Sequence, residues 1–275
     1  MLEIPESQAL AAQISETLTE KIIVAALAAT SPHGLAWYRG DPADYDKLLS
    51  GYTVLGAQAL GGQVEIMAGP MRLLLHDGIN ARYFEPGAKL PEKHQLLLRF
   101  DDASALVCTV QMYGGMQAYQ AETNDNPYYM AARQKPNPLT EAFSENYFAA
   151  IIRAGGPKLS AKALLATEQR IPGLGNGCLQ DILFNARIHP QTKMIDLRDG
   201  DMLTLFSSVK KTLLAMTEGG GRDTEKDLFG QEGGYKTILS NKTYGRPCPV
   251  CAGAIVRKSY LGGNIYFCPQ CQPLL

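Results

Sequence analysis

The sequence predicts an α+β protein with several domains: an N-terminal helix with a β-sandwich, then a helical domain, then a small cysteine-bearing module. Strand-like apolar runs occupy the first half, helical periodicity occupies most of 139–217, and four of the six cysteines stand near the C-terminal end. The chain has 275 residues, enough for one large domain or two ordinary ones, each with its own core. We expect the boundaries at 1–121, 122–138, 139–239 and 240–275.

The N-terminal domain is predicted from a change in hydrophobic period. Leu10, Ile14, Leu18 and Ile22 recur every four residues, so residues 5–22 should form an amphipathic helix. Strand-like runs follow, separated by turn residues, and together they predict a β-rich domain, most simply a sandwich. The clearest of these runs are residues 71–75, 95–100 and 104–110.

The second half combines a linker with a run of helices. Residues 122–138 contain three prolines and little periodicity, so we expect a linker there. Helices are expected at roughly 139–153, 160–169, 176–187 and 200–217. The last should end at the three glycines 219–221, and the glycine-rich loop 218–240 should be mobile.

Composition and charge limit the class of protein. Hydrophobic residues make up 45% and charged residues 19% of the chain, which is typical of a soluble globular protein. No apolar run reaches the ~20 residues that span a bilayer, and the first residues lack the pattern of a secretory signal. We therefore expect a cytoplasmic protein with reduced thiols and no membrane partner.

The charge of the chain is uneven along its length. The net charge is −1, but no Asp or Glu follows Glu232, while five basic residues do. This basic tail fits either a nucleic-acid contact or an ordinary solvated face. The five residues are Lys236, Lys242, Arg246, Arg257 and Lys258.

The four C-terminal cysteines predict one structural zinc ion. Cys248 and Cys251 form one C-x-x-C pair, and Cys268 and Cys271 form a second. Two such turns can close a tetrahedron of thiolates around zinc, whereas a redox-active pair would not need a duplicate. The residues between the pairs should form a hairpin, giving a zinc ribbon. The remaining Cys108 and Cys178 lie in apolar runs and should be inert core thiols.

A glycine-rich turn at residues 171–177 precedes a helical stretch. Its glycines, among them Gly175, let the backbone approach an anion closely. The amides that begin the following helix, together with the Asn176 side chain, could then bind a phosphate. The alternative is an ordinary helix connection in which Asn176 caps the helix.

Together these motifs resemble the formamidopyrimidine-DNA glycosylase / endonuclease VIII family over nearly the full chain. The motifs that carry the resemblance are Glu3-Ile-Pro-Glu6, residues 49–55 and 73–78, the segment GLGNGCLQDILFNARIHP at 173–190, and Tyr244-Gly-Arg246 followed by the cysteines. The resemblance implies a helix–two-turn–helix domain, a C-terminal zinc-ribbon finger and a monomer. It also implies that double-stranded DNA with a damaged base or an abasic site binds between the domains.

The same resemblance assigns roles to individual residues. It places Asn176 and Lys162 near the phosphates beside the lesion, although Lys162 could equally be a solvated helix lysine. It places Gly175 in the phosphate-binding turn and places Tyr244 and Arg246 at the DNA-facing start of the finger. Ile79 stands where the family often has a methionine wedge. The lesion itself would be read by the loop 218–240.

The catalytic pattern of the family is broken in this sequence. Members of the family attack the sugar with the nitrogen of an N-terminal proline, and a glutamate moves protons. Here Leu2 takes the place of the proline, so its nitrogen is an amide, and we expect the free amine on Met1, ~3.8 Å of chain away. Glu3 remains, though it could serve only as a local charge. The family's hairpin lysine falls at Gly62 and its finger arginine at Gly263.

Three hypotheses follow for the function. In the first, the protein binds lesion-bearing or abasic DNA with little or none of the family's standard glycosylase and lyase activity. In the second, it is an active enzyme that uses the Met1 amine or a water activated by Glu3. In the third, the fold serves as a protein-interaction scaffold.

Overall fold

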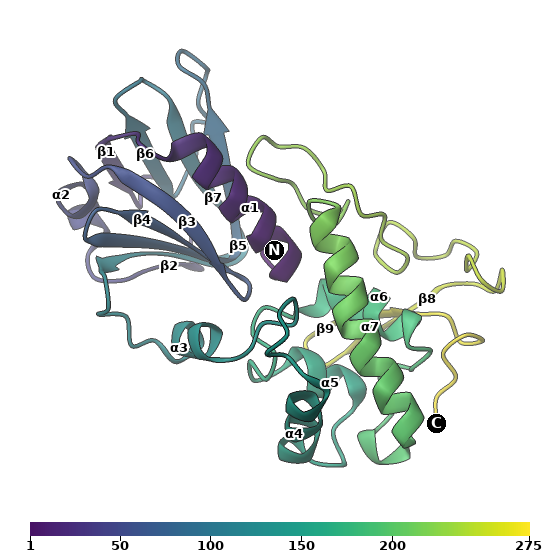
Figure 1. Ribbon diagram of the computed structural model, residues 1–275. Helices are drawn as coiled ribbons and strands as arrows, with labels where there is room; N and C mark the ends of the chain where they lie inside the picture. Colours follow the sequence, from purple (N-terminus) through teal and green to yellow (C-terminus); the bar gives the residue numbers. More distant parts are fainter.

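The computed structural model describes residues 1–275 and separates a sheet-rich part from a helical part (Figure 1). The sheet-rich part contains α1 (Ile4–Leu18), β1 (Ile23–Ala28), β2 (Ala36–Tyr38), η1 (Pro42–Asp44), α2 (Tyr45–Leu49), β3 (Val54–Leu60), β4 (Gln63–Ala68), β5 (Met71–Phe84), β6 (Leu96–Phe100) and β7 (Ala105–Gln120). The rest contains α3 (Pro127–Gln134), α4 (Glu145–Gly155), α5 (Ala161–Ala166), α6 (Asn176–Asn185), η2 (Met194–Asp196), α7 (Asp199–Glu218), β8 (Val256–Tyr260) and β9 (Gly263–Phe267).

The first helix, α1, lies against the sheet along its apolar stripe. Leu10, Ile14 and Leu18 are all buried in the core that the sheet encloses, as the four-residue period predicts. The helix ends at Leu18, earlier than predicted, because Thr19 is extended and Glu20 has a φ of 73°. Ile22 instead forms a bridge to Thr53 at the start of the sheet.

The strands form one continuous sheet with the order β1-β6-β7-β5-β4-β3, and β2 pairs in parallel with β7. The two longest strands, β5 and β7, change register between Asp77 and Ile79, which bends the sheet there. A single apolar core takes side chains from both ends of the strand order, including Ile23 of β1 and Val54 of β3. The sheet therefore folds over its own core, and its two halves make the predicted sandwich (Figure 1).

The segment predicted as a linker contains the short helix α3. Asn126 accepts hydrogen bonds from the first amides of that helix, and Pro127 occupies its first turn. The hydroxyls of Tyr129 and Tyr119 both donate to the buried Glu65 carboxylate, at 2.8 and 2.6 Å. These bonds fasten the segment to the sheet, a contact that its weak periodicity did not predict.

The helical part has a second core built around α6 and α7. Leu205, Val209 and Leu213 of α7 pack against Leu179 and Ile182 of α6. The core also includes Ile4, the first residue of α1, so the start of the chain belongs to both parts of the protein. Helix α5 is shorter than the 160–169 predicted, because Thr167 is extended and the next two residues have positive φ.

The hairpin β8–β9 packs on α6 and completes the C-terminal module. The Tyr266 amide donates to the Gln180 carboxamide at 3.0 Å, and the Gln272 amide group donates to the Ile188 carbonyl at 2.9 Å. These buried bonds fix the orientation of the finger on the helical part. None of the helices combines the length and the apolarity needed to cross a lipid bilayer.

Candidate functional site

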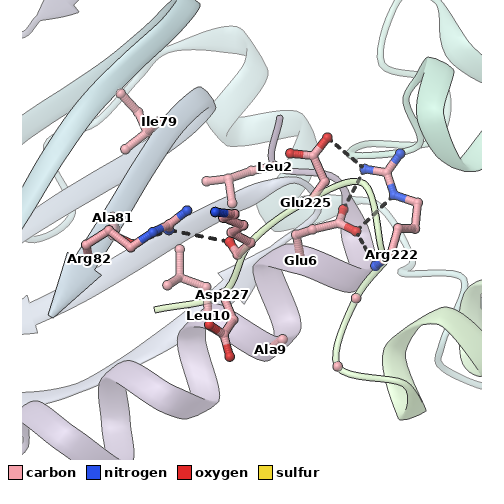
Figure 2. Close-up of a pocket in the computed structure, with 13 residues that line it drawn as sticks. Leu2, Glu6, Ala9, Leu10, Ile79, Ala81, Arg82, Arg222, Glu225 and Asp227 are labelled. Carbon is pink, nitrogen blue, oxygen red and sulfur yellow. Dashed lines mark hydrogen bonds and ion pairs between the residues drawn. The ribbon is translucent and has the colours of Figure 1, made fainter. Parts of the chain in front are cut away.

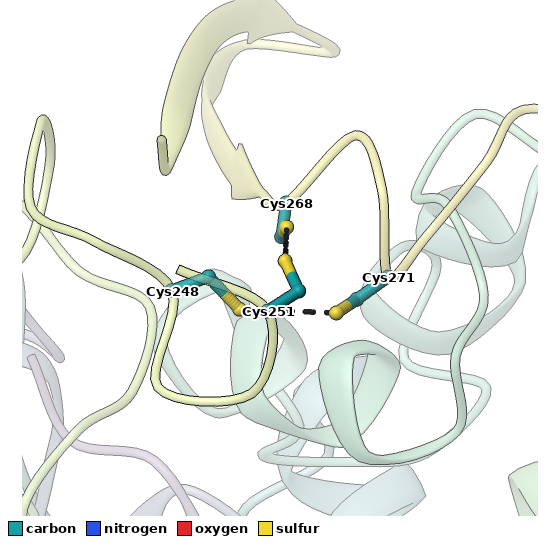
Figure 3. Close-up of side chains that lie close together, drawn as sticks. All are labelled: Cys248, Cys251, Cys268 and Cys271. Atoms are coloured by element: carbon teal, nitrogen blue, oxygen red, sulfur yellow. Dashed lines mark hydrogen bonds between the residues drawn. The ribbon is translucent and has the colours of Figure 1, made fainter. Parts of the chain in front are cut away.

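The four C-terminal cysteines converge on one point between the two tight turns that carry them (Figure 3). All their sulfur atoms lie within 4.8 Å of one another. The Cys251 and Cys268 sulfurs are 3.4 Å apart, and those of Cys248 and Cys271 are 3.8 Å apart. Tetrahedral zinc thiolates would sit about 3.8 Å apart, given Zn–S bonds of about 2.3 Å. The cluster could therefore bind one metal ion with four soft ligands.

The two other cysteines lie away from this cluster and are fully buried. Cys108 lies in the core of the sheet-rich part and Cys178 in the core of the helical part. Burial raises the pKa of Cys108 to about 12 and raises the pKa of Cys178 as well. Both thiols are therefore poor nucleophiles.

The start of helix α6 binds an anion, but the anion is the carboxylate of Glu3. The amides of Gly175, Gly177 and Cys178 donate to the two Glu3 oxygens at 3.0, 2.8 and 2.8 Å. The sequence analysis expected a phosphate at these amides, and in the structure the Glu3 carboxylate occupies them. The alternative, in which Asn176 caps the helix, does not hold, because Gly175 is the N-cap and the carboxylate of Glu3 accepts the free amides.

Arg222 connects this carboxylate to the first helix, and Figure 2 shows its contact with Glu6. Its guanidinium donates twice to Glu6, at 2.9 and 2.8 Å, and lies 3.4 Å from the nearer Glu3 oxygen. All three side chains are buried. Burial opposes the ionisation of Glu6, but the Arg222 charge and its hydrogen bonds outweigh that effect and hold the pKa of the Glu6 carboxyl below its usual value.

Two glycines of the turn make room for this network. A Cβ at position 177 would lie 1.4 Å from an Arg222 nitrogen, and a Cβ at position 175 would lie 2.6 Å from the Glu3 carboxyl carbon. Glycine is required at both positions because the backbone must approach two charged side chains. The sequence analysis had expected these glycines to let the backbone approach a phosphate.

The first two residues of the chain lie at the edge of a narrow pocket. The Leu2 nitrogen donates to the Asp77 carbonyl at 2.7 Å, as a peptide amide does. The Met1 nitrogen forms an ion pair with Glu225 at 2.5 Å. Figure 2 shows Leu2 and Glu225 among the residues that line the pocket, between α1, β5 and the loop after α7. The amine of Met1 is thus engaged by a carboxylate at the edge of the pocket.

Gly62 lies where three backbone segments meet. A Cβ at this position would lie 2.9 Å from the Leu2 carbonyl oxygen and 3.1 Å from the Gly173 Cα. The neighbouring Gly61 is equally close to the backbone of Pro172. Because the β3–β4 turn packs directly against the chain start and the 172–173 turn, a lysine side chain could not leave position 62 without displacing backbone.

Lys162, Asn176 and Gly263 meet at the tip of the finger hairpin. The Lys162 ammonium donates to the Tyr260 carbonyl at 2.7 Å, and the Asn176 amide donates to the Asn264 carbonyl at 2.9 Å. Lys162 is only 3% exposed, so it is not a solvated helix lysine, and burial lowers its pKa. A Cβ on Gly263 would lie 3.6 Å from both nitrogens, which is ordinary contact. Lys162 and Asn176, both expected to contact phosphates, therefore lie beside Gly263, where the family resemblance places an arginine.

The other residues predicted to contact DNA differ in their exposure to solvent. Tyr244 and Arg246 are both exposed on the segment that leads into the finger, and the Arg257 guanidinium lies over the Tyr244 ring at 4.9 Å. Ile79 is only 3% exposed and belongs to the core of the sheet-rich part, where it lines the pocket. A wedge would project from the surface, which Ile79 does not.

The loop 218–240 supplies the site residues that sequence reasoning missed. Arg222 and Glu225 both come from it, and Asp223 fastens it further by accepting from the Thr237 hydroxyl at 2.9 Å. The glycine content of the loop predicted mobility, whereas the structure has it bonded to both α1 and the chain start. An arginine and a glutamate between glycines were the only signal of these contacts in the sequence.

Comparison with known proteins gives a consistent result. No protein-family model matches the chain. A formamidopyrimidine-DNA glycosylase from Geotalea uraniireducens is 30% identical over 248 residues, covering 83% of this chain and 85% of the relative. A protein of the same name from Symbiobacterium thermophilum is 28% identical over 243 residues, covering 86% and 79%.

Two solved structures share the fold over nearly the whole chain. The MutM (Fpg) protein from Thermus thermophilus superposes with a TM-score of 0.82 at 21% identity, covering 99% of both chains. The complex of Lactococcus lactis Fpg with DNA containing an abasic site superposes with a TM-score of 0.83 at 22% identity, covering 98% of this chain and 99% of that one.

Proposed function

The chain belongs to the formamidopyrimidine-DNA glycosylase family, and from that premise we propose that it binds double-stranded DNA at a damaged base or an abasic site. We propose further that it performs little or none of the family's standard chemistry. The relative from Lactococcus lactis is bound to abasic-site DNA in its solved complex, and this chain has the same fold. Binding and chemistry are separable in such a fold, because they depend on different residues.

The observation that carries the proposal is the environment of the first three residues. The Leu2 nitrogen is an amide bonded to Asp77, and the Met1 nitrogen is paired with Glu225. Both Glu3 oxygens accept backbone amides at the start of α6, so this carboxylate has a structural role in capping the helix. The groups that would attack the sugar and move protons are thus each engaged in holding the fold.

Two residues that the family resemblance assigns to phosphate contacts support the proposal of binding. Lys162 and Asn176 converge on the finger hairpin, where a phosphate could accept from the Asn176 amide and from the Lys162 ammonium. Arg246 and Arg257 add positive charge on the same module, which carries no carboxylate side chain. This charge would favour a DNA backbone despite the net charge of −1.

We further propose that the metal at the four cysteines is one zinc ion. Four thiolates whose sulfur atoms all lie within 4.8 Å of one another suit zinc, and the closed set leaves no position for substrate. Cys248, Cys251, Cys268 and Cys271 would hold the ion, which would cross-link the two turns that carry the hairpin.

Two measurements on one pair of duplexes test the proposed function. We expect tighter, salt-dependent binding to a duplex with an abasic site than to the intact duplex, measured by fluorescence anisotropy. With borohydride present, we expect a covalent adduct to form about 100-fold more slowly than with a family member that carries the N-terminal proline. A displacement of one residue along the chain is large compared with the tolerance of an attacking group.

The outcomes separate the three hypotheses. Fast trapping, with mass spectrometry locating the adduct on Met1, would favour an active enzyme in which Glu225 accepts the amine proton. If the adduct instead formed on a chain whose first residue is Leu2, the Leu2 nitrogen would be an amine, and the argument that it is an unreactive amide would fail. Absence of DNA binding at low salt would leave only the scaffold hypothesis.

Restoring the missing arginine is expected to strengthen DNA binding. Gly263→Arg should fit, because its Cβ makes ordinary contacts and the φ of Gly263 is not in the left-handed region. One further neutralised phosphate should steepen the dependence of log affinity on log salt by about 0.9. The matched control is Ser259→Arg, which adds the same charge on the neighbouring strand. An equal gain from Ser259→Arg would mean that position 263 has no special access to the phosphate.

A further inference from the structure

A cluster of aromatic rings lies beside the chain start and takes no part in the contacts described so far. The Trp37 ring stacks on His76 with centroids 6.4 Å apart and planes at 24°, and it tilts against Tyr113 at 5.8 Å. Trp37 is 45% exposed, so much of its indole faces solvent. It is also the only tryptophan of the chain.

The rings are held by the sheet and by hydrogen bonds. His76 bonds through one ring nitrogen to the Asp77 carboxylate at 2.8 Å and through the other to the Gln117 carboxamide at 3.1 Å. A Cβ on Gly115 would lie 1.9 Å from the His76 ring, so the imidazole lies directly on the β7 backbone. Glycine at 115 therefore makes room for the ring that supports Trp37, and the aromatic surface is preorganised.

The cluster is continuous with the proposed DNA site. The Tyr113 hydroxyl contacts the Met1 sulfur at 3.9 Å, and the Asp77 carbonyl accepts from Leu2, which lines the pocket. On the other side of Tyr113, Met112 is 68% exposed at a φ of 66°, where the β5–β7 pairing is irregular. An exposed apolar side chain near an exposed indole ring is a combination that can separate and stack bases.

The chemistry of the cluster selects its occupant. The cluster contains no lysine or arginine, and none bonds to its members, so it presents no lysine or arginine charge to a phosphate. Its free surface is the face of an indole, which binds another flat ring by stacking. In a duplex with an abasic site, the flat ring without a partner is the base on the opposite strand.

We propose that Trp37, supported by His76 and Tyr113, is a stacking platform for the unpaired base opposite the lesion or abasic site. The inference rests on the proposed function, because it requires that the protein bind such DNA. It adds a binding residue on β2 and a ligand class, an unpaired nucleobase, that the phosphate contacts of the finger do not provide.

The single tryptophan makes the test direct. Fluorescence excited at a wavelength that tyrosine does not absorb reports Trp37 alone, so a duplex with an abasic site should quench it on binding, and the intact duplex should not. With 2-aminopurine as the unpaired base, emission of that base should fall as well. Trp37→Leu should lose about 10-fold or more in affinity for the abasic duplex, because stacking contributes about 1–3 kcal/mol per base. Its affinity for the intact duplex should be unchanged.

The controls separate stacking from a structural role. Trp37→Phe keeps a ring and should bind the abasic duplex within about threefold of wild type. Tyr128→Leu removes an exposed aromatic side chain on α3, outside the cluster, and should change nothing. If Trp37→Leu bound the abasic duplex as wild type does, or lost affinity equally for both duplexes, the stacking role of Trp37 would be overturned and the proposed function would stand. Failure of wild type to prefer the abasic duplex would overturn the proposed function and the platform with it.

Discussion

Replacing Arg222 with methionine is expected to destabilise the protein by about 3–5 kcal/mol, because two buried carboxylates lose their only strong cation. Arg222 pairs with both Glu3 and Glu6 inside the structure and also donates its backbone amide to Glu6 at 3.0 Å. Without it, the two negative charges would lie close together and away from water. Urea unfolding followed by circular dichroism measures the loss.

An exposed ion pair provides the matched control for this substitution. Arg198→Met breaks a pair with Asp201 at the solvent-exposed start of α7, and such pairs contribute at most about 1 kcal/mol. Adding Glu6→Gln to Arg222→Met should recover part of the loss, because it removes one of the stranded charges. A loss below about 1 kcal/mol for Arg222→Met would show that the buried network contributes little to stability.

The pH dependence of unfolding provides a second check. The pKa of Glu6 is lower in the folded protein than its usual value, so its ionised form is favoured by folding. Its contribution is fully present above the usual glutamate pKa and is lost as the pH falls through the lower, folded value. Wild type should therefore lose more stability on acidification than the Glu6→Gln variant does.

Removing the metal from the four-cysteine cluster is expected to abolish DNA binding by disordering the hairpin. Structural zinc contributes about 10–16 kcal/mol to the folding of isolated zinc fingers, and this module has a small core of its own. Lys162 and Asn176 both hold hairpin carbonyls, so they would lose their positions with it. Cys268→Ser should reduce bound zinc from one ion per chain, measured by mass spectrometry, and weaken binding by about 100-fold or more.

Another cysteine substitution serves as the control for the metal experiment. Cys108→Ala removes a buried thiol in the core of the sheet-rich part, far along the chain from the finger. It should leave the zinc content at one ion per chain and the affinity for DNA unchanged. Retention of full DNA binding after complete chelation of the metal would show that the finger is not part of the interface.

Local patterns in the sequence predicted the fold well, because they record interactions between near neighbours. The paired cysteines stand three residues apart, so their geometry follows from two tight turns. The apolar period of α1 gave its buried face, although the sequence did not mark its end at Leu18. The helix α3 was missed because its stability depends on Asn126, Pro127 and the distant Glu65 more than on periodicity.

The candidate site was less predictable, because its contacts join residues far apart in the chain. Glu3 caps α6 across 172 residues or more, and Glu6 meets Arg222 across 216. No local pattern in the sequence encodes such a pairing. The glycines at 62, 175 and 177 were visible, but the groups that they make room for became clear only in the structure.

The placement of Ile4 in the helical core has a consequence for how the chain matures on the ribosome. The first helix cannot complete its contacts until α6 has emerged and until the arginine that follows α7 has been synthesised. At typical elongation rates this takes on the order of ten seconds or more. Throughout that interval Ile4, Glu3 and Glu6 would lack their partners, so these residues would be among the last to reach their final positions.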